Sequence, residues 1–234
     1  MSSRRIAIIG DGQMGRAIES LARENGWDVV AVIGEKESNG GRGITAASLR
    51  NAVVAVEFTE PGAALANILS TLKAGVPVVV GTTGWYDSLP QATKAAAESG
   101  AALLWSPNFS VGVNLFLHLA ETAGRLWKST EGLDAHIVET HHARKKDAPS
   151  GTALAISKAT SATSGKSVPI TSVRVGSVPG THELILDGTF EQITLAHLAR
   201  DRRVFAEGAL RAADWLIGRK GVFTMRDVLG LEAS

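Results

Sequence analysis

The chain has no cysteine among its 234 residues, which excludes disulfides and thiolate metal sites but says nothing about the redox compartment. Its 24 Lys and Arg residues balance 23 Asp and Glu residues, and a net charge of +1 provides no global field for nucleic acid or for an anionic membrane. No apolar run approaches the roughly 20 residues that cross a bilayer. The first residues pass directly into a strand-like run with no signal-peptide core. We therefore expect a cytoplasmic protein with neither a nucleic-acid partner nor a membrane partner.

A glycine-rich turn near the N-terminus is the first informative pattern. The apolar run Ile6–Ile9 leads into the turn, and a helical pattern follows it. A strand, a G-x-G-x-x-G turn and a helix form the dinucleotide fingerprint: Gly10 allows the tight turn, Gly12 lets backbone approach the pyrophosphate, and Gly15 lets the helix pack on the sheet. The candidate cofactor-binding residues of this turn are Gly10, Asp11, Gly12, Gln13, Met14 and Gly15.

An acidic residue lies at the distance that this fingerprint requires. The run Val29–Ile33 reads as a second buried strand, and Glu35 follows Gly15 by about 20 residues, where an acid holds the adenosine ribose hydroxyls. Lys36, beside it, leaves room for a 2′-phosphate. The sequence therefore predicts NADH or NADPH as the cofactor and leaves the choice between them open. A glycine turn that binds no nucleotide is the alternative.

Strands rich in Val and Ile alternate with helical patterns up to about residue 110. We expect strands at 53–58, 76–80 and 101–105 and helices at 63–74 and 88–99, whereas the Gly-, Ser- and Asn-rich segment 37–50 predicts a loop. This alternation is typical of a Rossmann-like, doubly wound parallel sheet, whose ligands lie beyond the carboxyl ends of the strands. Small and hydroxyl residues at two such ends would let a flat nicotinamide approach, and the candidates are Gly81, Thr82, Thr83, Ser106, Pro107, Asn108 and Phe109.

The pattern changes after Ser110. A helix is expected through 111–126, with an apolar stripe formed by Val111, Leu115, Leu119, Ala123 and Leu126 and with His118 as a packed helix histidine. Strand-like runs follow at 135–139, 171–175, 182–186 and 190–197, and these runs do not alternate with helices. We therefore predict a second, α+β domain with an open, mostly non-parallel sheet.

The C-terminal part needs a core to cover. A helical pattern begins at Arg203, and the tail Val222–Leu229 is too apolar to be loose. The first sheet is its natural host. We predict that residues 1–110 and 204–234 form a discontinuous dinucleotide-binding domain and that residues 111–203 form a substrate-binding and oligomerisation domain.

Titratable and cationic residues gather in the segment E-T-H-H-A-R-K-K-D-A-P-S-G-T, residues 139–152. Pro149 suits the first turn of a helix, and Ser150 opens the apolar run behind it. Free amides at a helix start attract anions. Imidazole, ammonium and an anion-binding helix start therefore meet in one loop, which suits a small anionic substrate that gains or loses a proton.

Two other interpretations of this loop are open. A basic run is often a solvated surface loop, although the helix start directly behind this one favours a site. His141 and His142 are disfavoured as metal ligands, because adjacent residues on one loop rarely point at one ion and no cysteine or suitably spaced third ligand assists them. We expect no metal site.

The segment 139–153 closely resembles E-x-H-H-x-x-K-x-D-A-P-S-G-T-A, the signature of the 4-hydroxy-tetrahydrodipicolinate reductases (dihydrodipicolinate reductases) of lysine and diaminopimelate synthesis. Further similarities are V-G-T-T-G at 80–84, P-N-F-S-V-G at 107–112 and F-T-M-R-D-V-L at 223–229. The chain departs from the family in a glycine turn one residue shorter than G-x-G-G-x-M-G and in Glu57, where the family usually has Asp.

The resemblance implies an NADH- or NADPH-dependent reduction of 4-hydroxy-tetrahydrodipicolinate, a cyclic dicarboxylate, to tetrahydrodipicolinate. It implies proton transfer by His141 and Lys145, and substrate contacts from His142, Gly151 and Thr152. A non-catalytic Rossmann protein that senses the cofactor ratio is the alternative, and it would not need a paired histidine and lysine in one loop.

We also expect a homotetramer assembled through the second domain. The second sheet shows only one flanking helix, the one that starts at Ser150, so one face of the sheet would be bare. The apolar residues expected on that face are Leu184, Leu186, Ile193 and Leu195. Large exposed apolar patches usually mark interfaces, and the family resemblance implies tetramers joined by these sheets.

Overall fold

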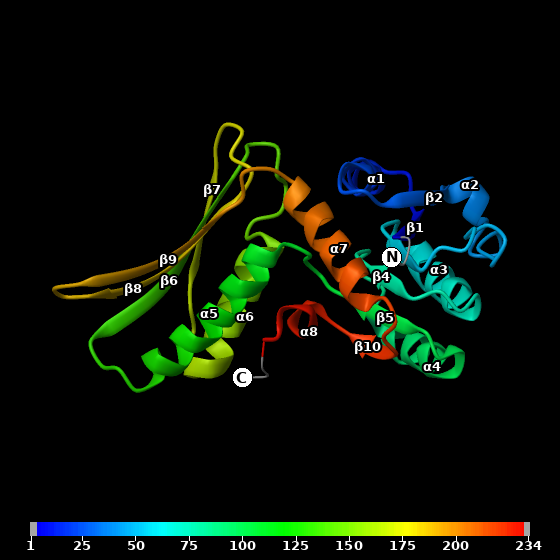
Figure 1. Cartoon of the computed structure of the whole chain (residues 1–234). Coiled ribbons are helices and arrows are strands. Elements are labelled where there is room, and N and C mark those ends of the chain that lie inside the picture. Colours follow the sequence, from blue (N-terminus) through cyan, green and yellow to red (C-terminus); the bar gives the residue numbers. More distant parts are fainter. Residues whose placement is uncertain (1–3, 232–234) are drawn as a thin grey trace. The chain divides into compact units, whose positions relative to one another are not determined.

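The structure, a computed structural model, describes residues 4–231, which divide into two compact units. The first unit comprises residues 4–110 and 203–231, and the second comprises residues 111–202. Each unit has its own sheet (Figure 1). Each unit also has its own apolar core. Among the described residues, no helix combines the length and the apolarity needed to cross a membrane.

The sheet of the first unit contains six strands, and all of its strand pairs are parallel. The strand order is β10 (Gly221–Phe223), β5 (Ala102–Trp105), β4 (Val78–Val80), β3 (Val54–Glu57), β1 (Arg5–Ile9) and β2 (Asp28–Ile33). Every residue of β3 and β4 is buried. Strands covered on both faces can be continuous apolar runs, which is why they were readable in the sequence. The predicted Rossmann-like parallel sheet is confirmed.

Helices of the first unit pack beside one another in pairs, α3 with α4 and α1 with α7. The segment after β2 differs from the expected loop, because a one-turn helix opens it and its Ile44 and Leu49 are buried. The helices are α1 (Gln13–Glu24), α2 (Glu35–Ser38), α3 (Pro61–Lys73), the 3₁₀ turn η1 (Tyr86–Ser88), α4 (Leu89–Ser99), α7 (Arg203–Leu216) and α8 (Met225–Leu229).

The strand order reverses direction at β1, since β2 lies on one side of it and β3 on the other. The loops that leave β1 and β3 approach each other closely. Gly10 has a φ of 110°, and a Cβ on it would overlap the carbonyl oxygen of Phe58. In doubly wound sheets, ligands bind beyond the carboxyl ends of the strands at this reversal. The glycine turn therefore lies where a nucleotide is expected.

The second unit has a four-stranded mixed sheet with two helices. Its strand order is β7 (Ile170–Arg174), β6 (Leu133–His141), β8 (Thr181–Gly188) and β9 (Gln192–Leu198). Only β6 and β7 pair in parallel, so the prediction of a mostly non-parallel sheet is confirmed. Helices α5 (Val111–Lys128) and α6 (Gly151–Ser164) pack together and share a core with the sheet (Figure 1).

The buried side of α5 is not the expected one. Leu115, Leu119 and Leu126, from the predicted stripe, are 43%, 51% and 66% exposed. The side that faces α6 carries small residues instead, and a Cβ on Gly124 would overlap the side chain of Thr163. The two helices therefore approach closely where their side chains are small, and the large leucines lie elsewhere on α5.

The leucines of β8 and β9 are also placed differently from the prediction. Leu184 and Leu186 are buried, and Leu195 packs partly buried against the same core. The expectation of a bare sheet face at these residues is wrong, because two helices rather than one cover it. Of the four residues expected there, Ile193 alone is exposed, on the edge strand β9. Phe190, predicted to lie in a strand, is in the turn between β8 and β9 and is 97% exposed.

Candidate active site

His141 is the last residue of β6 rather than part of a loop, since the strand predicted for 135–139 extends to it. Alternate residues of a strand face the same side. Glu139 and His141 therefore share the side of Ile137, which faces the helices, and all three are buried. The side chain of His141 is 10% exposed, and that of Glu139 is fully buried. The strand thus holds a titratable ring at the edge of an apolar core.

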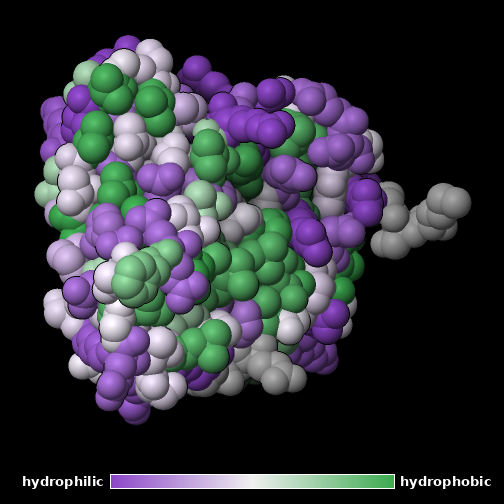
Figure 2. Space-filling view, turned by 90° about the vertical axis from the view of Figure 1, so that its left-hand side faces the viewer, coloured by the Kyte–Doolittle hydropathy of each residue, from purple (hydrophilic) through white to green (hydrophobic). Residues whose placement is uncertain are grey.

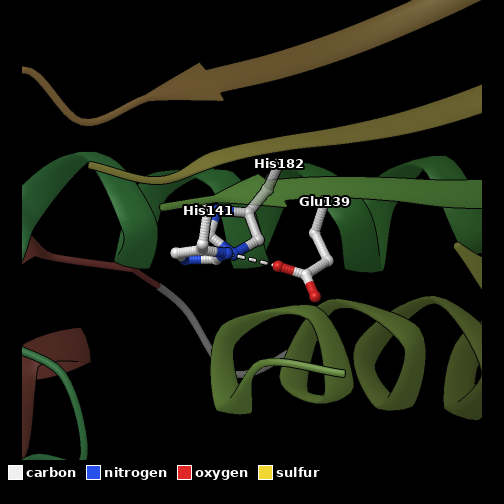
Figure 3. A group of neighbouring side chains, drawn as sticks. All are labelled: Glu139, His141 and His182. Atoms are coloured by element: carbon white, nitrogen blue, oxygen red, sulfur yellow. Dashed lines mark hydrogen bonds and ion pairs between the residues drawn. The ribbon is translucent and has the colours of Figure 1, made fainter. Parts of the chain in front are cut away.

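Glu139 is the centre of a cluster of polar contacts (Figure 3). Its Oε2 forms a short hydrogen bond with Nδ1 of His141. Its Oε1 accepts from Nη2 of Arg174 at 2.6 Å and from the amide of Ser150 at 3.3 Å. Nη2 of Arg174 also donates to the carbonyl oxygen of Asp147 at 2.6 Å. One buried carboxylate therefore joins β6, β7 and the start of α6.

Burial and these contacts act in opposite directions on the titratable groups. Burial raises the pKa of Glu139, but hydrogen bonds from Arg174, Ser172 and His141 outweigh it and lower the pKa to about 2. Burial lowers the pKa of His141, although the Glu139 carboxylate opposes that change. Glu139 is therefore an anion at neutral pH, and His141 gives up a proton more readily than an exposed histidine does.

A second buried histidine faces this cluster. His182 on β8 lies with its ring edge against the His141 ring, at 5.1 Å between centroids, and its Nε2 is 3.1 Å from Oγ of Ser150. Burial, followed by the charge of His141, lowers its pKa to about 4. His182 is therefore neutral at pH 7 and adds no positive charge beside His141.

The segment between β6 and α6 carries the cationic residues. The amide of Lys145 donates to the carbonyl oxygen of His142 at 3.0 Å, which closes a turn. Nζ of Lys145 lies 2.8 and 2.9 Å from the two carboxylate oxygens of Asp147. Nε2 of His142 is 3.5 Å from Nη2 of Arg202. Lys145 is partly buried, with 23% of its side chain exposed.

The start of α6 differs in one respect from the expected one. Pro149 does not lie in the first turn, because the helix begins at Gly151 and Ser150 is its N-cap. Oγ of Ser150 accepts from the amide of Ala153 at 3.2 Å. Gly151 is exposed and Thr152 partly exposed, so the first turn of α6 presents backbone amides near the cationic turn.

Glu139, His141 and His182 each place one potential metal-ligand atom within 4.8 Å of the others. The carboxylate already faces the guanidinium of Arg174, and its second oxygen bonds the His141 ring. A metal ion here would replace these contacts and would lie close to a fixed positive charge. The donor set therefore favours a hydrogen-bonded acid–base cluster over a metal site.

The glycine turn of the first unit has the space that a dinucleotide needs. A Cβ on Gly15 would overlap the carbonyl oxygen of Gly10, so glycine is required there for the turn to pack. A Cβ on Gly12 would meet no atom within 4 Å. Gly12 is the N-cap of α1, and the exposed residues Asp11 to Gln13 surround this open space at the helix start. Free amides at such a start bind phosphate.

The remaining candidates of the first unit lie at strand ends. Glu35 and Lys36 are exposed in the first turn of α2, directly after β2. Oγ1 of Thr82 accepts from the amide of Thr59 at 2.7 Å, and Thr83 is exposed beside it. Oδ1 of Asn108 accepts from the amide of Ser110 at 2.8 Å, which is the turn-forming role of an asparagine. These residues therefore lie in the segments that follow β2, β4 and β5. The same segments contain the other candidates, Gly81, Ser106, Pro107 and Phe109.

Phe109 is 2% exposed, packs on Phe58 at 5.7 Å between ring centroids and has Gly208 against its carbonyl oxygen. The Phe109 ring is therefore packed inside the first unit, beneath the candidate cofactor site.

Sequence reasoning missed Arg174 and His182 and gave Glu139 no role of its own. Arg174 lies beside His141 in the β6–β7 register, and His182 beside Glu139 in the β6–β8 register. The signal that was present is the i, i+2 spacing of Glu139 and His141, which predicts that both side chains lie on one face of a strand.

Comparisons with known proteins agree with this arrangement. The family model described as dihydrodipicolinate reductase, N-terminus, matches residues 4–109, and the one described as dihydrodipicolinate reductase, C-terminus, matches residues 112–229. The 4-hydroxy-tetrahydrodipicolinate reductase of Thiobacillus denitrificans is 38% identical, with 98% of this chain and 100% of the relative covered. That of Christiangramia forsetii is 33% identical, with 96% and 97% covered.

A solved structure agrees in fold. The dipicolinate-bound dihydrodipicolinate reductase from Paenisporosarcina sp. TG-14 superimposes with a TM-score of 0.79 at 23% identity, covering 95% of this chain and 98% of that one. At this identity the likeness supports the fold alone. The two family models together span nearly all of the described residues. The chain belongs to the dihydrodipicolinate reductase family.

Proposed function

We propose that this chain reduces 4-hydroxy-tetrahydrodipicolinate to tetrahydrodipicolinate, in diaminopimelate and lysine synthesis, with NADH or NADPH as the reductant. The observation that carries the proposal is the buried His141, with the Lys145 turn and the exposed start of α6 beside it on the same unit. The Paenisporosarcina relative binds dipicolinate, which supports a cyclic dicarboxylate as the ligand of this site. A cytoplasmic location is also part of the proposal.

The residues have separate tasks in this proposal. The 4-hydroxyl group leaves the substrate ring as water, and the nicotinamide, when bound, would supply a hydride to the unsaturated ring that remains. His141 donates a proton to the enamine-like anion that results, and Lys145 assists that transfer and binds a substrate carboxylate. The His142 ring and the amides of Gly151 and Thr152 bind the carboxylates, since helix-start amides favour anions.

The first unit would hold the reductant. The glycine turn, from Gly10 through Asp11, Gly12, Gln13 and Met14 to Gly15, would bind the pyrophosphate, because Gly12 leaves open space at the start of α1. The segments Gly81–Thr83 and Ser106–Phe109 would line the nicotinamide. These residues are proposed from their positions after the strands of a doubly wound sheet.

A direct assay tests the function. Freshly prepared 4-hydroxy-tetrahydrodipicolinate is added to the protein with NADH and, separately, with NADPH, and the decrease in nicotinamide absorbance is followed. Turnover with at least one reductant is expected. Tight binding of the cofactor without turnover would instead favour the cofactor-sensing alternative.

Cofactor choice gives a sharper prediction. If Glu35 holds the ribose hydroxyls, Glu35→Ala weakens NADH binding more than NADPH binding, whereas Lys36→Ala does the reverse because a 2′-phosphate loses its counter-charge. Fluorescence titration of the wild type and both variants measures this. Glu37→Ala, in the same short helix, is the matched control. Unchanged affinities in both test variants would place ribose recognition elsewhere.

We further propose that the protein is a homotetramer, with contacts through the outer face of the second sheet. This face is the one that α5 and α6 do not cover. A row across its four strands consists of Val173, Thr140, Thr181 and Leu198. Val173 and Leu198 are 38% and 64% exposed. Figure 2, viewed from the side on which the β8–β9 hairpin lies in Figure 1, shows hydrophobic side chains exposed among hydrophilic ones.

Leu198→Lys should reduce the mass of this assembly, because it places a charge in a buried contact. Light scattering at micromolar concentration measures it, and Leu126→Lys on the exposed side of α5 is the control. A wild-type mass near 24.5 kDa would defeat the tetramer proposal. Loss of assembly in the Leu126 variant alone would move the interface to α5.

A further inference from the structure

Glu139 and Arg174 lie behind the proposed proton donor, and no other task in the reaction accounts for them. We propose that Glu139 and Arg174 are positioning residues: Glu139 keeps the proton of His141 on Nδ1 and so reserves Nε2 for the substrate, and Arg174 holds Glu139 and the turn that carries Lys145. This inference rests on the proposed function, because His141 and Lys145 are its proton-transfer groups.

The contacts of Glu139 determine which nitrogen of His141 carries the proton. An ionised carboxylate can only accept hydrogen bonds. Because hydrogen bonds keep Glu139 ionised, its short contact with Nδ1 requires a proton on that nitrogen. The neutral ring therefore has its lone pair on Nε2, and the protonated ring releases its second proton from Nε2. Donation from Nε2 to a substrate carbon leaves a neutral ring with the proton still on Nδ1.

Arg174 connects the two proton-transfer groups. Its Nη2 donates both to Oε1 of Glu139 and to the carbonyl oxygen of Asp147, each at 2.6 Å. The Asp147 carboxylate in turn holds Nζ of Lys145. Nη1 of Arg174 donates to the carbonyl oxygen of Val173 at 2.7 Å, which fixes the guanidinium at the end of β7. A planar guanidinium with several donors can bind these three acceptors at once, whereas a lysine ammonium does not reproduce that geometry.

The surroundings keep His141 in place from the other side. Gly180, with a φ of 152°, precedes β8, and a Cβ on it would lie 3.0 Å from Nε2 of His141. The ring of His182 packs edge-on against the His141 ring. The ring is therefore held at Nδ1 by Glu139 and enclosed by β8, so that its orientation does not depend on the substrate.

The charges around His141 predict how each variant changes its titration. The groups that face it are Glu139 on β6, Arg174 on β7, His182 on β8 and Lys145 with Asp147 in the turn. Burial lowers the pKa of His141 most, Glu139 raises it, and Lys145 and Arg174 lower it. An acid is active while protonated, so kcat/KM falls as the pH rises through this pKa. Removing the charge of Glu139 must move that fall to lower pH.

The test is the pH profile of kcat/KM, with kcat and KM measured separately, for Glu139→Gln, Arg174→Gln and Arg174→Lys in the full-length enzyme. Glu139→Gln is expected to lower kcat by at least about tenfold, as loss of a histidine's orienting carboxylate does in other enzymes, and to move the fall in activity to lower pH. Arg174→Gln should lower kcat and raise KM, because both proton-transfer groups lose their position. Arg174→Lys should recover part of the kcat. The matched control is Glu121→Gln, which alters another Glu–His pair, on α5.

Specific outcomes overturn the inference. If Glu139→Gln keeps kcat within twofold and titrates like the wild type, Glu139 has no positioning role. If Arg174→Gln raises KM alone, Arg174 is only a substrate-binding cation. Should Glu139→Gln fail to fold, as judged by circular dichroism, nitrogen NMR of the wild-type histidines decides: a proton on Nε2 rather than Nδ1 in neutral His141 refutes the proposal. Absence of wild-type turnover would defeat the proposed function, whereas the NMR result tests the positioning of His141 independently of it.

Discussion

His141→Gln is expected to reduce kcat by about 10²–10⁴-fold, the usual contribution of a general acid, while KM changes much less. Glutamine is polar and can still donate to the Glu139 carboxylate, so the buried carboxylate keeps a partner. It cannot titrate near neutral pH, and the proton supply is therefore lost. Steady-state kinetics with the cyclic dicarboxylate measures both constants.

His118→Gln is the matched control for this variant. His118 lies on α5 in the same unit, its side chain is 30% exposed, and its Nδ1 lies 3.6 Å from a carboxylate oxygen of Glu121. The substitution therefore removes a similar His–Glu contact, but one that is not on β6. Its kcat should equal that of the wild type. A near-normal kcat in His141→Gln, with a normal circular dichroism spectrum, would remove His141 from the chemistry and leave Lys145 as the proton source.

The parallel sheet could be predicted from the sequence because its strands are buried on both faces. A run such as Val78–Val80 can then be interpreted only as a buried strand. The segments between such runs must contain the helices that connect parallel strands. Less of the second unit's packing could be predicted from the sequence. Alternation along β8 correctly grouped Leu184 with Leu186, but it cannot say which element covers them.

Helix α5 shows why the sequence pattern predicted the wrong buried side for a helix of the second unit. Apolar residues occur on both sides of this helix, and its buried side carries Val113, Phe116 and Trp127 together with small residues. Gly124 and Ala120 are buried at the close contact, whereas Leu119 and Leu126 are exposed. Because large apolar residues lie on both sides of α5, hydrophobic spacing alone does not select the side that is buried, and the close approach at Gly124 is not visible in that pattern.

The site residues that are close together in the sequence could be predicted, whereas those brought together by strand pairing could not. His141, Lys145 and the start of α6 lie within one short segment, from the end of β6 to the first turn of α6. Arg174 and His182 join them only because β7 and β8 pair with β6 in a particular register. A shift of one residue in either pair would turn these side chains to the opposite face.

Gly15→Ala is expected to lower the melting temperature and to abolish cofactor binding together. The new Cβ would overlap the carbonyl oxygen of Gly10, a backbone atom that cannot move without shifting the turn. Overpacking of this kind costs roughly 1–3 kcal/mol, and each kcal/mol corresponds to about 2–4 °C in a chain of this size. Thermal melting and NADH titration measure the two effects.

Gly12→Ala separates folding from binding at the same turn. Gly12 has a φ of −71°, which any residue can adopt, and its Cβ would meet no atom within 4 Å. The melting temperature should therefore stay at the wild-type value. A pyrophosphate that approaches this backbone would meet the new methyl group, so NADH and NADPH affinity should fall by about tenfold or more, equivalent to roughly 1.4 kcal/mol. Unchanged affinity for both cofactors in the Gly12 variant would show that the pyrophosphate does not lie against this turn.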